Sequence, residues 1–223
     1  VPEGKTETGD IDPKGALAAA QTDAVEAQKK REENLRATFY KKMYALPGGI
    51  SSERASRYEN MYYDTKALFF LETPDLWNLY TPLPGTVAPG EEEEAKNRTI
   101  LDNNYNAFLN RYLANPGAYR TGANFNAKLD DVVNWFKLSE EQREANKEKL
   151  AVYEGLFGNT PEGLRNRDRL WAMSVTRGQQ GYYSDQILGA VNKLATYYRN
   201  IGKSEDEVFG IMAGLGRKRP PTQ

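Results

Sequence analysis

The residues in this sequence that could do chemistry are acidic side chains set among aromatic ones between positions 58 and 77. Two carboxylates flanking an aromatic-lined groove are the arrangement that hydrolyses glycosidic bonds. A carboxylate-based hydrolase acting on glycans is therefore one hypothesis, although solvated carboxylates on a surface helix are the simpler explanation. A strongly raised carboxyl pKa in a cleft would distinguish the two. The candidates are Glu59, Asp64, Glu72 and Asp75, near Tyr58, Tyr62, Tyr63 and Trp77.

The chain contains no histidine and no cysteine among its 223 residues. The commonest general base, the Ser-His-Asp triad and nearly all zinc and haem ligation therefore have no candidate residue. Disulfides and thiol nucleophiles are excluded for the same reason. We expect no catalytic residue, no metal and no cofactor, and an enzyme is the less favoured class of function.

A second group of candidate residues is basic. Arg165 and Arg169 share one face of an expected helix, and the C-terminal tail is basic and then rich in proline. A nucleic-acid-associated helical protein is thus a further alternative, which binding lost steeply with added salt would support. The 30 basic and 31 acidic residues argue against it, because a general nucleic-acid binder carries a strong basic excess. Ion pairs with Glu162 and Asp168 explain the arginines more simply.

The composition leaves the cellular location open. The apolar and aromatic content is sufficient for a hydrophobic core. No apolar run approaches the ~20 residues that a membrane-spanning helix needs, so we expect no membrane span. The sequence starts at Val1, which is compatible with a processed protein. A virion, a periplasmic or other extracytoplasmic location and the cytoplasm all fit the composition.

The candidate residues must be positioned by helices, and the longest is expected from Asp12 to Leu46. Asp12 suits the N-cap, Pro13 suits the first helical position and Pro47 ends the helix. At 1.5 Å per residue this helix would span roughly 50 Å, so we expect one end to dock on a core and the other to reach a partner. Its second half carries apolar residues spaced four, four and three apart, namely Leu35, Phe39, Met43 and Leu46.

The first half of this helix, from Ala16 to Leu35, consists mainly of alanine and charged residues. A solvated helix face is the plain interpretation. The sharper one is a coiled-coil arm, with a seam formed by Leu17, Ala20, Ala24 and Ala27. Alanine buries little area, so such a seam needs close packing or several partners.

The rest of the chain predicts further helices separated by proline and glycine. Two capping boxes, beginning at Ser139 and Ser204, mark helix starts. No strand-like alternation and no fixed-period repeat is found, so the expected fold is all-α, with seven or eight helices and the long N-terminal helix packed on an irregular helical bundle. The expected organisation is a flexible tail (1–11), the long helix plus an aromatic helical hairpin (12–81), a Pro/Gly-rich extended loop (82–90), a helical bundle (91–215) and a basic Pro-rich tail (216–223).

These features favour a non-enzymatic structural or interaction subunit of a larger protein assembly, with a virion or an envelope or secretion complex as its most plausible setting. The expected partners are other protein subunits, in a homo- or hetero-oligomer, and nucleic acid is disfavoured. Tyrosine and tryptophan are common interface anchors, and extended loops often bind neighbours. We expect the fold to survive removal of residues 1–30 while assembly weakens. The predicted partner-binding residues are Leu17, Ala20, Ala24, Ala27, Trp77, Tyr80, Pro82, Leu83, Pro84, Arg217, Lys218 and Arg219.

Overall fold

The computed structural model describes residues 13–48, 52–81, 88–121, 123–175 and 185–217. Every secondary-structure element in these ranges is an α-helix, as the hydrophobic periodicity predicted. The expected tail 1–11 lies outside the described residues, as do most of the loop 82–90 and of the tail 216–223. The helices are α1 (Pro13–Tyr44), α2 (Ser52–Glu72), α3 (Pro74–Tyr80), α4 (Glu91–Ala114), α5 (Pro116–Thr121), α6 (Ala123–Trp135), α7 (Glu140–Ala145), α8 (Lys147–Phe157), α9 (Pro161–Val175), α10 (Asp185–Asn200) and α11 (Glu205–Arg217).

The described residues form eleven helices, more than the seven or eight expected. One difference is α5, a short helix that begins at a proline. Asn115 follows the end of α4, and its side chain also accepts a hydrogen bond from the Ala118 amide, while Pro116 fills the first position of the new helix. Another is the break between α7 and α8, where the Asn146 side chain donates to the Gln142 carbonyl at 2.7 Å. Such local side-chain bonds compete with a continuous helix.

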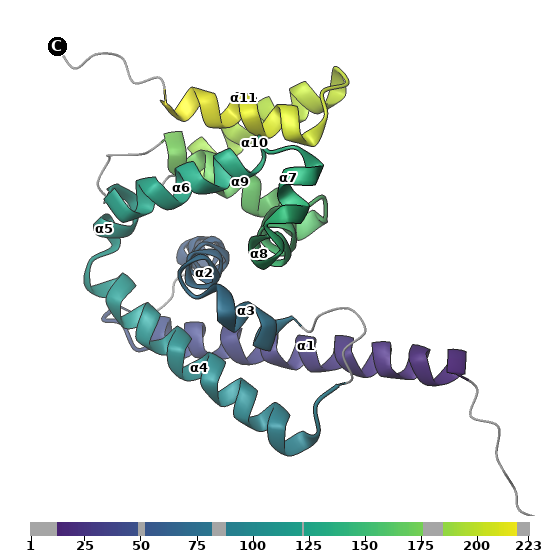
Figure 1. The fold of residues 1–223 in the computed structure, drawn as a ribbon. Coiled ribbons are helices and arrows are strands. Elements are labelled where there is room, and N and C mark those ends of the chain that lie inside the picture. The colour runs from purple at the N-terminus through teal and green to yellow at the C-terminus, as the bar shows by residue number, and fades with distance from the viewer. Residues whose placement is uncertain (1–12, 49–51, 82–87, 122, 176–184, 218–223) are drawn as a thin grey trace, which may run out of the picture.

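The helices form two groups with α2 between them (Figure 1). The first group contains α1, α3 and α4, and the second contains α6 to α11, with α5 at the turn that connects them. Helix α2 contacts α1, α3 and α4 on one side and α8 and α9 on the other. The chain therefore curves around α2, and the N-terminal half of α1 extends beyond the body.

One hydrophobic core joins the two groups of helices. It includes the predicted residues Leu35, Phe39 and Met43 of α1, which are fully buried. Leu46, expected on the same face, is instead 36 % exposed, because α1 ends at Tyr44 and the chain turns there. The core continues without interruption into α9 and α11.

Helices α1 and α4 run in the same direction, side by side. Three polar pairs join them in register, because Arg31 contacts Glu94, Thr38 contacts Asp102 and Lys42 contacts Asn110. These pairs hold α1 to α4 from Arg31 onward, and Gln28 donates a further hydrogen bond to Thr81 at 3.2 Å. In the described part of the chain, no helix is both long and apolar enough to cross a bilayer.

Candidate functional site

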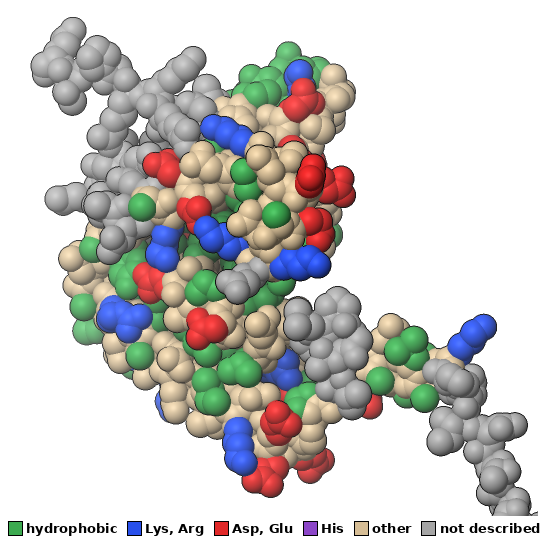
Figure 2. All heavy atoms as spheres, in the orientation of Figure 1, with side chains coloured by type: hydrophobic (Ala, Val, Ile, Leu, Met, Phe, Trp, Pro, Cys, Tyr) green, Lys and Arg blue, Asp and Glu red, His purple; other side chains and the backbone are tan. Residues whose placement is uncertain are grey.

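The most unusual surface of the molecule is the N-terminal part of α1, residues 14–26, which we call the arm. Its side chains are exposed except for Ala20 and Ala24, which are half-buried. Two large apolar side chains, Leu17 and Val25, are 56 % and 67 % exposed. The arm extends from the body as a separate rod with apolar atoms on its surface (Figure 2). A free helical segment of this length is only marginally stable in water, so a bound partner would stabilise it.

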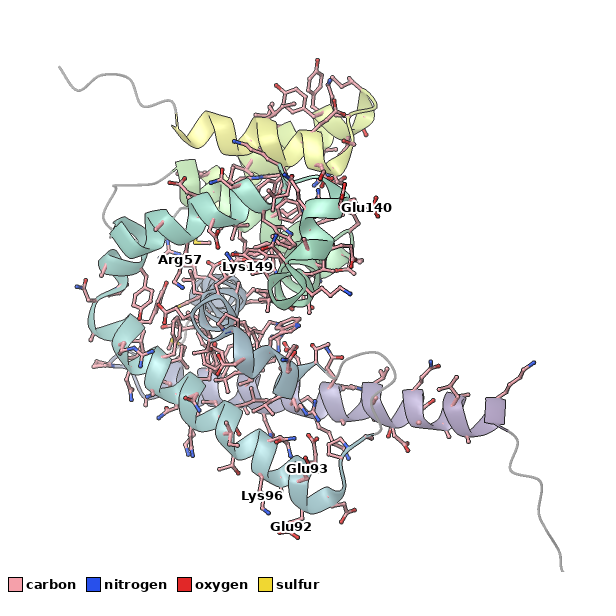
Figure 3. The ribbon with its side chains drawn as sticks, viewed as in Figure 1. Arg57, Glu92, Glu93, Lys96, Glu140 and Lys149 are labelled. Atoms are coloured by element: carbon pink, nitrogen blue, oxygen red, sulfur yellow. The ribbon has the colours of Figure 1, made fainter. Side chains whose placement is uncertain are left out.

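The arm joins the body of the molecule near Arg31, where α1 is rigidly supported. The Arg31 guanidinium, 3 % exposed, contacts both carboxylate oxygens of Glu94 and donates to the Tyr80 carbonyl at 3.1 Å. Glu94 belongs to an acidic run at the start of α4, where negative charge interacts favourably with the helix dipole. Glu92 and Glu93 of that run are exposed, and Glu92 pairs with Lys96 in the first turns of α4 (Figure 3). Glu94 instead turns inward and fixes the direction in which the arm leaves the body.

A buried polar network next to this ion pair ties the two groups of helices together. The Lys66 ammonium, on a residue only 1 % exposed, donates to Glu32 at 3.1 Å and to Glu162 at 2.7 Å. The hydroxyls of Tyr62 and Tyr80 donate to the same Glu32 carboxylate. The network therefore joins α1, α2, α3 and α9.

In this network the pKa shifts of Glu32, Tyr62 and Tyr80 each favour a single protonation state. Burial alone would raise the pKa of Glu32, but the charge of Lys66 and the hydrogen bonds from Tyr62, Tyr80 and Lys66 outweigh it and leave the pKa below its ordinary value. Burial, followed by the charge of Glu32, raises the pKa of both phenols. A fixed carboxylate, two neutral phenols and a lysine between two carboxylates form a stable cross-link rather than an acid–base pair.

The four candidate carboxylates of the hydrolase hypothesis do not share one environment. Glu59 and Asp75 are exposed, whereas Glu72 faces Arg111 at 3.7 Å. Asp64 is 4 % exposed and lies 3.9 Å from the Arg169 guanidinium. At 1.5 Å per residue, Glu59 and Glu72 are roughly 20 Å apart along α2, farther than two carboxylates that act on one bond.

The arginines of α9 are used inside the fold. Arg169, 6 % exposed, donates to Asn60 at 3.0 Å and lies over the Tyr63 ring. Arg165 covers the same ring, with its guanidinium carbon 5.7 Å from the ring centroid. Arg167 is buried over Phe136. Of the three arginines only Arg165 is exposed, so a single guanidinium of this cluster is accessible to a phosphate.

The predicted partner-binding residues occupy three kinds of position. Trp77 and Tyr80 are each 5 % exposed and belong to the core, and the Trp77 ring fits so closely against α8 that a Cβ at Gly155 would lie 2.2 Å from it. Leu17, Ala20, Ala24 and Ala27 do lie on one face of α1, as expected from their spacing. Outside the described residues are Pro82, Leu83, Pro84, Lys218 and Arg219, together with the side chain of Arg217.

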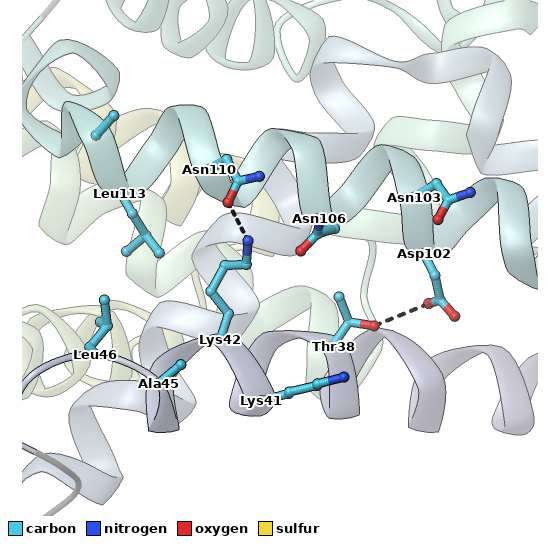
Figure 4. A pocket seen from close by; sticks show the side chains of 11 residues that line it. Thr38, Lys41, Lys42, Ala45, Leu46, Asp102, Asn103, Asn106, Asn110 and Leu113 are labelled. Carbon is cyan, nitrogen blue, oxygen red and sulfur yellow. Dashed lines mark hydrogen bonds between the residues drawn. The ribbon is translucent and has the colours of Figure 1, made fainter.

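A groove of about 780 Å³ opens between the second half of α1 and α4 (Figure 4). One end is apolar, with Leu46 and Leu113, and the rest is polar. At the polar end, Thr38 donates to Asp102 at 3.4 Å. Burial raises the pKa of Asp102, and the Thr38 hydrogen bond and the charge of Arg98 oppose this only in part. Lys41 lies on the α1 side of the groove.

The α4 side of the groove carries three asparagines, Asn103, Asn106 and Asn110. Asn110 accepts a hydrogen bond from Lys42, whereas the other two carboxamides make none within the described residues. The sequence analysis missed this groove. The spacing of three and four was visible, but its pairing with α1 depends on residues more than 60 positions away.

No protein-family model matches the chain, and no curated protein or solved structure is significantly similar to it. The geometry described above is therefore the basis for assigning a function. Its main elements are a rigidly supported arm, an open groove at the opposite end of the same helix, and a part-buried polar network centred on Lys66.

Proposed function

We propose that this chain is a non-enzymatic structural subunit of a larger protein assembly, and that the arm binds another subunit. The observation that carries the proposal is the exposed arm, whose direction is fixed by the buried Arg31–Glu94 ion pair. Its apolar side chains, Leu17 and Val25, gain from burial in a partner. A rigid support reduces the entropy lost when the arm binds.

The size of the arm indicates the kind of assembly. Thirteen residues of helix extend for roughly 20 Å, and full burial of a leucine or valine side chain contributes about 1.5–3 kcal/mol. A stable interface usually buries about 800 Å² on each partner, more than one face of such a short helix supplies. We therefore propose that arm contacts are repeated or supplemented by contacts of the body.

A virion, or an envelope or secretion complex, is the setting that we propose. In such assemblies many copies of a subunit are held at fixed positions, so individually weak contacts add through high effective concentration. The hydrolase and nucleic-acid alternatives have less support, because their candidate carboxylates are dispersed along α2 and α3 and two arginines of α9 are buried.

The proposal is tested by deleting residues 1–26 and measuring solution mass by light scattering over a range of concentrations. We expect the deletion to keep the helical circular dichroism of α2 to α11 and to lose the higher-mass species of the full chain. The substitution Ile100→Glu, at an exposed apolar residue of α4 outside the arm, is the matched control and should keep those species. An unchanged mass after the deletion, or global unfolding, would contradict the proposal.

A further inference from the structure

We infer that the subunit bound by the arm is a second copy of this chain, and that the arm occupies the groove between α1 and α4. The inference rests on the proposed function, because it identifies the partner of the same arm. The two surfaces lie at opposite ends of α1, so one molecule presents both of them (Figures 1 and 4).

The groove has the shape that a third, slender helix fits. It is bounded by two parallel helices, and short side chains at Thr38, Ala45 and Ala114 keep it open. On the arm, Ala20 and Ala24 share the face of Leu17 and permit close approach. The groove is lined by no aromatic side chain among the described residues, so it lacks the stacking platform on which sugars and single-stranded bases are usually held.

The two surfaces also match at their apolar ends. Leu46, 36 % exposed, and the half-buried Leu113 form the apolar end of the groove. Leu17 is the only leucine of the arm and is 56 % exposed. Placing Leu17 between Leu46 and Leu113 removes exposed apolar surface from both copies at once.

The charges fix the direction of the arm. With Leu17 at the apolar end, Asp23 lies ~9 Å farther along the arm, and Lys41 lies about one turn before the end of α1 at Tyr44. If the arm runs antiparallel to α1, Asp23 meets Lys41, whose ammonium makes no hydrogen bond or ion pair within the described residues. On a helix with 3.6 residues per turn, Gln21 lies one turn after Leu17 on nearly the same face, so it enters the groove and meets the carboxamides of α4.

This direction makes the contact reciprocal. When two copies of α1 lie antiparallel, the arm of each reaches the groove of the other, so a two-fold dimer forms with both arms docked. Antiparallel packing also pairs the helix dipoles favourably. The dimer closes on itself, and exposed apolar residues such as Tyr197 and Ile201 of α10 remain outside this contact.

The test uses two full-length charge variants, Asp23→Lys and Lys41→Asp, alone and mixed in equal amounts. Each variant alone places like charges in both arm contacts, so we expect dimerisation at least about tenfold weaker than in the wild type at low salt. The mixture restores opposite charges in both contacts of the mixed dimer. We expect sedimentation or light scattering to show dimers again in the mixture.

Two control variants should leave the dimer unchanged. Glu26→Lys changes a charge on the side of the arm opposite to Leu17, and Lys193→Asp changes an exposed lysine on α10. A monomeric wild type, variants that dimerise like the wild type, or a mixture that stays monomeric would each overturn the inference. If deletion of residues 1–26 lowers the mass but Lys41→Asp does not, the arm binds a different surface and only the inference falls. An unchanged mass in both variants would contradict the proposed function as well.

Discussion

The two halves of α1 form one continuous helix but differ in side-chain burial and in residue composition. From Arg31 onward, every fourth residue is buried, ending with Met43. Before Arg31 no side chain is buried in the described part of the helix, and the residues are mainly alanine, glutamine and charged types. The second half is held by the core, whereas no side chain of the arm is buried in that core.

This difference shows how a helix can be both a structural element and a tether. Alanine has the highest helix propensity, so the arm needs little packing to stay helical once the next turn is fixed. The fixed turn is supplied by Arg31 and by the Glu32–Lys66 network. Changes to the buried residues of the second half should therefore affect folding, and changes in the arm or on the groove side of α1 should affect association.

The largest expected contrast is between core and arm truncations. Phe39→Ala removes a fully buried ring and should cost about 3–5 kcal/mol of unfolding free energy. Leu17→Ala, in the arm, should change the unfolding free energy of the monomer by less than about 0.5 kcal/mol. Chemical denaturation of both variants at low protein concentration measures this. A large effect of Leu17→Ala would show that the arm packs on the body.

Breaking the ion pair at the base of the arm should be nearly as damaging. Arg31→Met leaves the buried Glu94 carboxylate without its guanidinium and should cost about 3–5 kcal/mol. The double variant Arg31→Met/Glu94→Met, which leaves no unpaired charge, should recover much of that loss. Equal losses in the single and double variants would mean that the pair is not the support of α1. Urea unfolding with both variants provides the measurement.

The polar network predicts a pH dependence in the second half of α1. The pKa of Glu32 is lower in the folded chain than its ordinary value of 4.5, so its contribution to stability is complete above pH 4.5. The contribution is lost as the pH falls through the folded pKa. Thermal unfolding between neutral and acidic pH should show this loss, and Glu32→Gln should flatten the profile. The matched variant Glu26→Gln, in the arm, controls for the change in net charge. An identical acid profile for Glu32→Gln would count against the network.

The smallest expected effect comes from alanine-to-glycine substitutions, which compare the two halves of α1 through helix propensity alone. Ala19 and Ala37 are both exposed on α1, one in the arm and one in the second half. Ala37→Gly should cost about 1 kcal/mol of unfolding free energy. Ala19→Gly should leave global stability unchanged, because the arm can fray without unfolding the core. Equal costs in thermal unfolding would indicate that α1 unfolds as one unit.

Much of the fold was predictable because local patterns determine it. The apolar face of Leu35, Phe39 and Met43 was predicted correctly, and both capping boxes form, with Ser139 bonded to Gln142 and Ser204 to Glu207. The extra helix α5 and the break at Asn146 were missed. In both places one asparagine side chain bonds to nearby backbone, which changes the structure without changing the hydrophobic pattern.

The site was less predictable because its parts are distant in sequence. That Leu17, Ala20, Ala24 and Ala27 share one face of α1 could be predicted from spacing alone. The burial of Trp77 depends on Gly155 in α8, and the inward turn of Glu94 depends on Arg31 in α1. Nothing in the acidic run at the start of α4 distinguishes Glu94 from its neighbours until the two helices are placed side by side.

Hydrogen exchange along α1, followed by mass spectrometry at low and high protein concentration, tests the central claim most directly. In the dilute monomer we expect amides of residues 14–26 to exchange rapidly and those of residues 31–43 to exchange slowly. At high concentration the arm should become protected, because association stabilises its helix. Arm amides that are already as protected in the dilute chain as those around Phe39, with no change on concentration, would contradict the account.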